Sequence, residues 1–213
     1  MSLDNIQQAI ILGNVASISS SVQNLLEQGQ TAQQILDLQL LPGMAIVGER
    51  FKRNEMFLPQ VLMSAQAMQT AIDILKPHLI QDATGSSRNT VVIGTVKGDM
   101  HDIGKNLVRI MLLGAGFEVI DLGVNVPPQR FLEATATHQA QVVCLSALLS
   151  STMNNMREIV QLFRNDEILH STKIMIGGAP VNRAFSESIG ADGYAPTAPG
   201  AVERIQGLVF NDR

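Results

Sequence analysis

Several residue types and segments are scarce or missing in this chain of 213 residues. It has no tryptophan, and its single cysteine, Cys144, excludes an internal disulfide. No lysine and arginine cluster stands out at a net charge of −4, which argues against a nucleic-acid face. No apolar run approaches the length of a membrane span, and the N-terminus lacks a signal-peptide pattern. We therefore expect a cytoplasmic protein with neither a nucleic-acid nor a membrane partner.

Nucleotide-binding fingerprints are also missing. No G-x-G-x-x-G follows the first expected strand, and no G-x-x-x-x-G-K-[ST] occurs, so neither a nicotinamide cofactor nor a nucleoside triphosphate is expected. Hydrophobic residues make up 46% and aromatic residues 4% of the chain, so the core must consist of Leu, Ile, Val, Met and Ala. Cys144 lies in an apolar run and is interpreted as a small buried hydrophobic residue.

The pattern of residues 1–80 is helical throughout and predicts a small bundle of about four helices. A capping-box pattern at Thr31 opens one helix, and Pro42 and Pro59 both suit a first helical turn. Apolar residues recur at helical spacing after Pro59. Pro77 is expected to end or bend that helix.

Residues 81–89 are polar and are interpreted as a linker between the helical cap domain (1–80) and a second domain (90–213). In the second domain, continuous apolar runs alternate with helical stretches. Continuous apolar strands indicate burial on both faces, and the alternation predicts a doubly wound parallel sheet in an α/β fold. Five strands favour a flavodoxin-like order. The expected strands are 90–95, 117–122, 142–146, 173–177 and 193–195, and the expected helices are 104–113, 128–137, 153–163, 182–188 and 200–209.

The loop after the first expected strand carries the pattern Asp99-x-His101-x-x-Gly104. It puts an imidazole at the carboxyl end of a parallel strand, where open α/β sheets hold their ligands. Asp99 can accept the second ring N–H, as a carboxylate usually does beside a metal-ligating histidine. A glycine three residues later removes a side chain where a bulky group would approach. A polar surface histidine and a capping aspartate are the alternative interpretation.

Two further loops follow strands at the same expected edge. The segment 146–152 is rich in hydroxyl groups, which either contact a ligand or cap the following helix, Thr152 in particular. Gly177-Gly178 forms a turn or clears space beside a ligand. His101 has no second His or Cys nearby, so a closed zinc site is not expected. One imidazole suits a metal that brings its other ligands with it, as a macrocycle does.

These motifs resemble the cobalamin-binding module of methionine synthase and of the small corrinoid methyl-carrier proteins. The resemblance covers nearly the whole chain. It rests on Asp99-x-His101-x-x-Gly104, Ser146-x-Leu148 and Gly177-Gly178, each in the loop after a different strand. In the helical part, the segments 43–44, 47–51 and 55–61 look like the bundle that covers the reactive face of the corrin in this family.

The resemblance implies a cobalamin cofactor, as methylcobalamin or another cobamide, with cobalt as the metal. His101 would be the lower cobalt ligand in place of the cofactor's own base, which would be buried in the sheet. Asp99 would hydrogen-bond the other ring nitrogen, and Thr152 would end this relay. The implied cofactor-binding set is Phe51, Leu58 and Val61 over the methyl group, and Gly98, Asp99, Met100, His101, Asp102, Ile103, Gly104, Ser146, Leu148, Ser150, Gly177, Gly178, Tyr194 and Ala195 around the lower ligand and the nucleotide tail. Without the resemblance, the three helical residues would be interpreted as bundle core.

By the same resemblance, the chain is a methyl carrier that is a substrate of other enzymes rather than a complete enzyme. A donor-specific methyltransferase would load the methyl group, and a second methyltransferase would unload it to tetrahydrofolate or a thiol, with an external reductive activator. A cobalamin-responsive sensor and the cobalamin subunit of a mutase are the alternatives. The lack of a basic recognition helix argues against the first, and the cap against the second.

Overall fold

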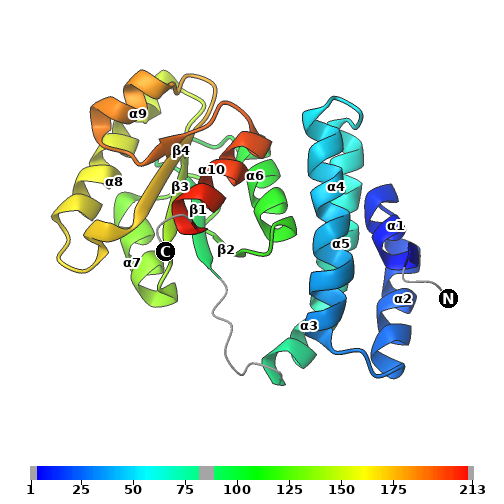
Figure 1. Ribbon diagram of the computed structural model, residues 1–213. Coiled ribbons are helices and arrows are strands. Elements are labelled where there is room, and N and C mark those ends of the chain that lie inside the picture. The colour runs from blue at the N-terminus through cyan, green and yellow to red at the C-terminus, as the bar shows by residue number, and fades with distance from the viewer. Residues whose placement is uncertain (1–3, 82–88, 211–213) are drawn as a thin grey trace. The chain divides into compact units, whose positions relative to one another are not determined.

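A computed structural model describes residues 4–81 and 89–210 of the protein. These residues fall into two compact units, a helical unit and an α/β unit (Figure 1). The predicted linker, 81–89, lies mostly outside the described residues: Gln81 ends the last helix of the first unit and Asn89 precedes the first strand. No helix in the described part of the chain is long and apolar enough to cross a membrane.

The described residues of the helical unit form four helices of nine residues or more, as expected, and one short helix, α3. Helix α5 packs against α1, α2 and α4, and α3 leads into a π-helical segment that runs directly into α4. The elements are α1 (Asp4–Leu12), α2 (Val15–Glu27), α3 (Ala32–Ile35), the π-helical segment Leu36–Leu40, α4 (Leu41–Lys52) and α5 (Leu58–Gln81).

The capping box at Thr31 and the helix start at Pro59 are as the sequence predicts, whereas Pro77 does not end its helix. The Thr31 hydroxyl accepts the backbone N–H of Gln34 at 3.2 Å, while the Gln34 side chain accepts the N–H of Thr31 at 3.0 Å, forming a capping box. Pro59 lies in the first turn of α5. Helix α5 does not end at Pro77 but continues for one more turn to Gln81. A proline inside a helix removes one N–H donor and crowds the carbonyl of the preceding turn, which can kink a helix without ending it.

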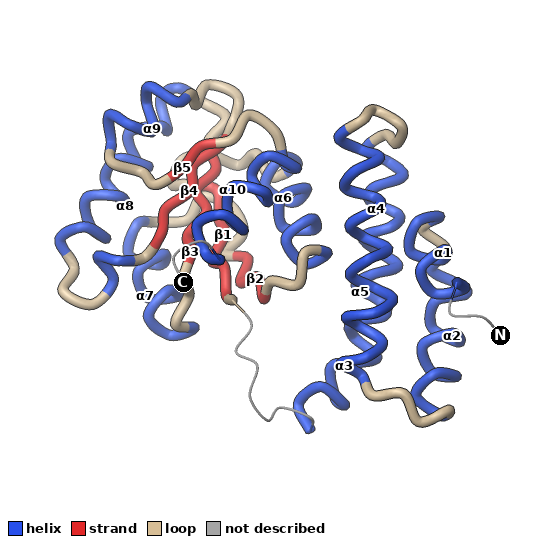
Figure 2. Tube along the Cα trace, in the orientation of Figure 1, coloured by secondary structure: helices blue, strands red, loops and turns tan. Residues whose placement is uncertain are grey.

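The α/β unit is a sheet of five parallel strands in the order β2-β1-β3-β4-β5, which confirms the flavodoxin-like prediction (Figure 2). Strands β1, β3 and β4 have the predicted bounds, while β2 and β5 are shorter. The strands are β1 (Thr90–Thr95), β2 (Glu118–Asp121), β3 (Val142–Ser146), β4 (Lys173–Gly177) and β5 (Gly193–Tyr194).

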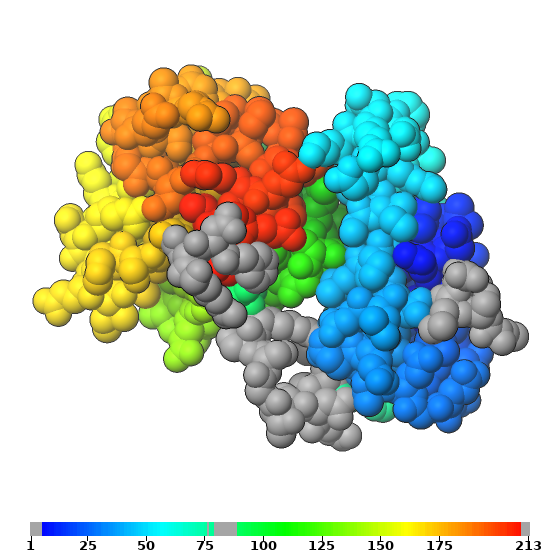
Figure 3. Space-filling view, in the orientation of Figure 1, coloured from blue at the N-terminus to red at the C-terminus, as the bar shows by residue number. Residues whose placement is uncertain are grey.

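Helices cover both faces of this sheet (Figure 1). The apolar core on one face packs against α7, α8 and α9, and its largest buried side chains are Phe131 and Phe163. Helices α6 and α10 cover the other face (Figure 1), and the α10 atoms (red) face the viewer in the space-filling view (Figure 3). The helical elements are α6 (Ile103–Gly114), α7 (Pro128–His138), α8 (Met153–Asn165), α9 (Arg183–Ile189), α10 (Ala198–Phe210) and the short 3₁₀ turns Ser150–Thr152 and Leu169–Ser171.

The prediction that every strand is buried on both faces is wrong for β2. Its residues are exposed or half-buried, whereas all six residues of β1 are buried. The reason is strand order, because β2 lies at the edge of the sheet and has one neighbour only.

Candidate functional site

A cavity of about 630 Å³ lies between the sheet and helices α6 and α10. It opens among the loops that follow β1, β3, β4 and β5, at the edge where doubly wound sheets bind their ligands. Its volume is within the range of sites for small molecules and cofactors. The lining residues are Ile93, His101, Asp102, Ile103, Gly104, Lys105, Leu107, Val108, Cys144, Leu145, Ser146, Leu148, Met175, Ile176, Gly177, Gly178, Ala179, Tyr194, Ala195, Pro196, Thr197, Ala198, Ala201 and Ile205.

The alternation of side chains along the strands decides which residues reach this cavity. Ile93, Cys144 and Met175 are partners across β1, β3 and β4, so their side chains share one face of the sheet. The following residues, such as Leu145 and Ile176, pack into the core on the other face. Burial raises the pKa of the Cys144 thiol to about 12, so this side chain is neutral in the cavity.

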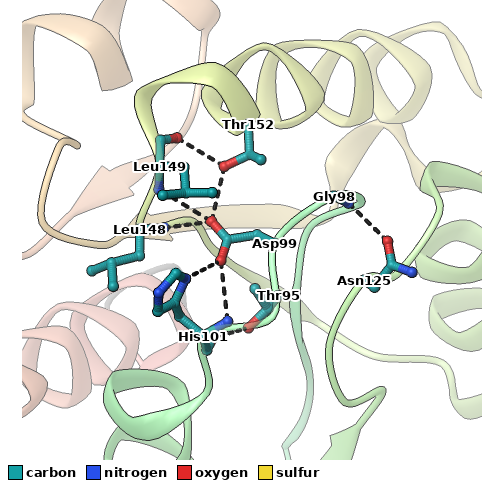
Figure 4. Close-up of polar contacts among 8 residues, drawn as sticks. All are labelled: Thr95, Gly98, Asp99, His101, Asn125, Leu148, Leu149 and Thr152. Atoms are coloured by element: carbon teal, nitrogen blue, oxygen red, sulfur yellow. Dashed lines mark hydrogen bonds and ion pairs between the residues drawn. The ribbon is translucent and has the colours of Figure 1, made fainter.

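The Asp99 carboxylate is fully buried and lies within 3.2 Å of five hydrogen-bond donors (Figure 4). Its Oδ1 lies 2.7 Å from Nδ1 of His101 and 3.1 Å from the backbone nitrogen of the same residue. Its Oδ2 accepts the backbone N–H groups of Leu148 and Leu149, at 2.7 and 3.2 Å. The Thr152 hydroxyl lies 2.9 Å from the same oxygen. A carboxylate held by so many donors is strongly stabilised in its charged form.

The ionised Asp99 determines the tautomer of His101. Burial alone raises the pKa of Asp99, but the hydrogen bonds from the His101 ring, from the backbone N–H groups of Leu148 and His101, and from Thr152 outweigh it. They hold the pKa well below its ordinary value. Because the carboxylate only accepts, Nδ1 of His101 must carry the proton. In the neutral ring, Nε2 therefore keeps a free lone pair, and the side chain is 52% exposed.

Three further contacts hold the loop that carries these residues. The Thr95 hydroxyl donates to the His101 carbonyl at 2.8 Å, and the Asn125 side chain accepts the N–H of Gly98 at 2.8 Å (Figure 4). The backbone N–H of Asn125 also donates to the Asp99 carbonyl at 2.9 Å. Gly98 has a positive φ of 81°, which suits glycine. The sequence patterns do not single out Asn125, whose positive φ of 54° is visible only in the structure.

The expectation that the Thr152 side chain caps the following helix is wrong. Thr152 occupies the N-cap position of α8, but its hydroxyl makes no capping bond. The hydroxyl instead lies 2.9 Å from Asp99 Oδ2 and 2.8 Å from the carbonyl oxygen of Leu149, with one proton for two acceptors. The contacts join Thr152 to Asp99 and Asp99 to His101, in the order that the family resemblance implies.

Two of the three glycines that line the cavity differ in their surroundings. A Cβ at Gly178, where φ is +130°, would overlap the carbonyl oxygen of Ala147. A Cβ at Gly104, in the first turn of α6, would meet no protein atom within 4 Å. The backbone conformation and the nearby Ala147 carbonyl therefore require a glycine at position 178, whereas the space beside Gly104 is available to a ligand.

The structure brings most of the predicted cofactor-binding residues to the cavity, but not all. The predicted residues that line it are His101, Asp102, Ile103, Gly104, Ser146, Leu148, Gly177, Gly178, Tyr194 and Ala195. Gly98, Asp99, Met100 and Ser150 lie outside the lining. Among these, Asp99 hydrogen-bonds to Nδ1 of His101. The Met100 side chain is exposed. In the helical unit, Val61 is fully buried, while Phe51 and Leu58 are half-buried.

Lys105 lines the cavity, although no sequence pattern indicates it. Its side chain is 2% exposed, and its Nζ lies 2.7 Å from both carboxylate oxygens of Asp121 and 2.8 Å from Oδ1 of Asn106. Asn106 in turn donates to Asp102 at 3.0 Å. The chain of contacts joins the edge strand β2 to the residue that follows His101. Its sequence signal is weak, because a lysine at the start of a helix usually faces solvent.

Lys105→Met is expected to lower the free energy of unfolding by about 1–3 kcal/mol, because it leaves the partly buried Asp121 carboxylate without its ammonium partner. The measurement is chemical denaturation followed by circular dichroism. Lys97→Met is the matched control, since Lys97 is exposed and its substitution should change stability by less than about 0.5 kcal/mol. If the two variants lose the same free energy of unfolding, the ion pair between Lys105 and Asp121 does not stabilise the fold.

The residues at this edge fit a corrinoid. No group of three or more His, Cys, Asp or Glu side chains that could hold a metal ion occurs within residues 4–81 and 89–210. The site therefore offers a single imidazole nitrogen, which matches a metal whose other ligands are supplied by a macrocycle. The cavity beside it has space for a nucleotide tail, and the open position at Gly104 has room for bulky groups.

Comparison with known proteins supports the same conclusion. Two family models described as B12 binding domains match residues 89–204 and 2–76. The chain is 36% identical over 203 residues to a corrinoid protein of Desulfitobacterium hafniense (strain Y51), covering 94% of both chains. It is 40% identical over 176 residues to the dimethylamine corrinoid protein of Methanosarcina barkeri, covering 83% of both.

A solved structure agrees with these relatives. The fold matches a chain of the methanol:cobalamin methyltransferase complex of Methanosarcina barkeri with a TM-score of 0.89 and 30% identity, over 98% of this chain and 79% of that chain. The family matches cover both the helical unit and the α/β unit. The chain therefore belongs to the corrinoid proteins, the cobalamin-binding methyl carriers of methyltransferase systems.

Proposed function

We propose that this protein binds its cobamide with the lower base displaced and His101 on cobalt. In this form it carries a methyl group between two methyltransferases. The observation that carries the proposal is the pairing of a half-exposed imidazole with a fully buried, ionised carboxylate at the cavity edge. Asp99 keeps the proton on Nδ1 and leaves Nε2 as the only ring nitrogen with a free lone pair.

Bound cobalt supplies a nucleophile that takes up a methyl group and gives it to an acceptor. The protein residues hold the site around this chemistry. Asp99 orients the imidazole, and Thr152, Leu148 and Leu149 orient Asp99 from the loop after β3. A second proton on the His101 ring would occupy the Nε2 lone pair, so the Asp99–His101 pair would hold cobalt only while Nε2 is unprotonated.

The two units have separate roles in the proposal. The α/β unit holds the cofactor, with Ser146 and Leu148 beside the nucleotide tail and Gly104 and Gly177 leaving room for it. The helical unit, as a cap domain, shields the methyl group through Phe51 and Leu58. Val61 belongs to the same proposed set, and its side chain has no exposed surface.

The partners follow from the carrier role. One methyltransferase transfers a methyl group from its specific donor to the protein, and the relatives named for dimethylamine and methanol favour a small methylated amine or alcohol. A second methyltransferase passes the methyl group to tetrahydrofolate or a thiol. An external reductive activator restores the carrier after accidental oxidation of its cofactor.

Electron paramagnetic resonance of the Co(II) form tests the ligand assignment. With nitrogen-15 in the protein and nitrogen-14 in the cofactor, a protein ligand splits each cobalt line into two, whereas the cofactor's own base splits it into three. We expect two lines in the wild type and loss of this splitting in His101→Ala. A three-line pattern in the wild type would contradict the proposal, because the cofactor's own base would then be the ligand.

His138→Ala is the matched control for this measurement. His138 is exposed at the end of α7, on the opposite face of the sheet from α6 and α10. Its substitution is expected to retain the two-line pattern. If the two lines persist in His101→Ala, the assignment of the ligand to His101 is wrong.

A further inference from the structure

The deep part of the cavity has an apolar floor. Ile93, Cys144 and Met175 form one row across β1, β3 and β4, two residues below the row that contains Ser146 and Gly177 at the strand ends. Val91 and Val142, two residues further from the cavity mouth, are fully buried and close the floor beneath this row. A ligand group that reaches this row meets aliphatic carbon and sulfur.

Helices α6 and α10 complete this floor with further apolar side chains, Val108 and Ile205 among them. Gly193 is the partner of Met175 in β5, and a Cβ there would overlap the Met175 sulfur. The glycine thus leaves space for the methionine side chain. The flexible thioether of Met175 is suited to fill irregular gaps against an apolar ring.

The polar side chains in the lining do not face a ligand at this depth. Tyr194 packs against the core on the opposite face of the sheet, and Asp102 lies beyond the end of β1, next to His101. Lys105 has three ammonium protons, and its three short contacts, to the two oxygens of Asp121 and to Asn106, account for all of them. His101, Ser146 and Thr197 lie at or beyond the ends of the strands, at the cavity mouth. Cys144 is neutral and is a weak hydrogen-bonding group.

We propose that the row Ile93–Cys144–Met175 selects cobamides by their displaced lower base and favours an apolar base, such as 5,6-dimethylbenzimidazole, over adenine. Adenine places an amine and ring nitrogens where dimethylbenzimidazole has methyl groups and C–H bonds. Each polar group buried without a partner weakens binding, and one such group lowers affinity by about tenfold. This inference rests on the proposed function, because the base must leave cobalt to reach the floor.

The test is a competition among three corrinoids for a limiting amount of the apoprotein. The probes are cobalamin, its analogue with adenine as the lower base, and cobinamide, which has no nucleotide. Bound corrinoids are separated from free ones by gel filtration, released and quantified by chromatography. We expect a preference of at least about tenfold for cobalamin over the adenine analogue, with cobinamide bound more weakly than cobalamin.

The three probes separate failure of the inference from failure of the proposed function. If cobalamin and its adenine analogue bind equally and cobinamide binds more weakly, the tail occupies the cavity but the floor does not select the base, which overturns the inference alone. If cobinamide binds as tightly as cobalamin, the tail does not occupy the cavity. That outcome overturns the inference and the displaced-base form together.

Two variants at one floor position sharpen the test. Met175→Gln adds a polar amide of similar length, and we expect it to reduce the preference for cobalamin at least about threefold because adenine gains a partner. Met175→Leu keeps the floor apolar and is expected to retain most of the wild-type preference. If the two variants prefer cobalamin over the adenine analogue to the same degree, this row does not select the lower base. If Met175→Gln fails to fold, the wild-type competition decides the matter.

Discussion

Asp99→Asn is expected to weaken cobalamin binding about 10- to 100-fold, the usual cost of losing the partner of a metal-ligating histidine. The physical reason is the tautomer of His101. The asparagine NH₂ group is itself a donor, so it avoids the Oδ2 position, where two backbone N–H groups and the Thr152 hydroxyl point at it. The NH₂ group therefore takes the place of Oδ1. There it donates to Nδ1 of His101, which moves the ring proton to Nε2 and blocks the nitrogen that would bind cobalt.

The same substitution should also reduce stability. The backbone N–H of His101 loses its acceptor at Oδ1 and stays next to an amide nitrogen, which costs about 1–3 kcal/mol. Affinity is measured by titration of the apoprotein with cobalamin, and stability by urea denaturation. Thr152→Val is the matched control, because it removes one donor to Asp99 and leaves the His101 tautomer unchanged. If Thr152→Val weakens binding as much as Asp99→Asn, the tautomer argument is wrong.

The low pKa of Asp99 sets the direction of a pH effect on the apoprotein. An acid whose pKa is lower in the folded state stabilises the fold above its unfolded pKa, here about 3.8, and this contribution disappears as the pH falls towards the folded value. We therefore expect the wild type to lose stability below about pH 4, and Asp99→Asn to lose less over the same interval. The measurement is the denaturation midpoint of each protein at about pH 5 and about pH 3, an interval that includes the ordinary aspartate pKa.

Two glycine substitutions at the same cavity are expected to have opposite effects on the apoprotein. Gly178→Ala should lower the free energy of unfolding by about 3–5 kcal/mol, because its φ of +130° is unfavourable for alanine and the Cβ overlaps the Ala147 carbonyl. Gly104→Ala should raise it by up to about 1 kcal/mol, since the position is in a helix and the Cβ meets no protein atom.

Cobalamin affinity shows whether Gly104→Ala affects the cofactor site or only an exposed helix position. The Gly104 backbone lines the cavity, so an added methyl group occupies volume that the ligand needs, and we expect about 5- to 100-fold weaker binding. Thermal unfolding of the apoprotein and cobalamin titration provide the two readouts. A Gly104→Ala variant that is stable and binds like the wild type would show that this position is not part of the cofactor site.

The sequence by itself determined the order of the elements and the place of the central motif. Strands β1, β3 and β4 have their predicted bounds because continuous apolar runs between polar loops are local signals. The capping box at Thr31 and the proline-initiated α5 are local for the same reason. The pairing of Asp99 with His101 was also predictable, because the two residues are two positions apart in one loop.

Tertiary structure decided what surrounds that pair. The donors to Asp99 Oδ2 come from residues 49, 50 and 53 positions away, and Thr152 turns its hydroxyl from the helix N-cap towards this carboxylate. The Lys105–Asp121 contact and the row Ile93–Cys144–Met175 likewise join separate strands and helices. In a parallel sheet, neighbouring strands are joined only through crossover connections, so their register follows from packing of the whole domain and no local pattern encodes it.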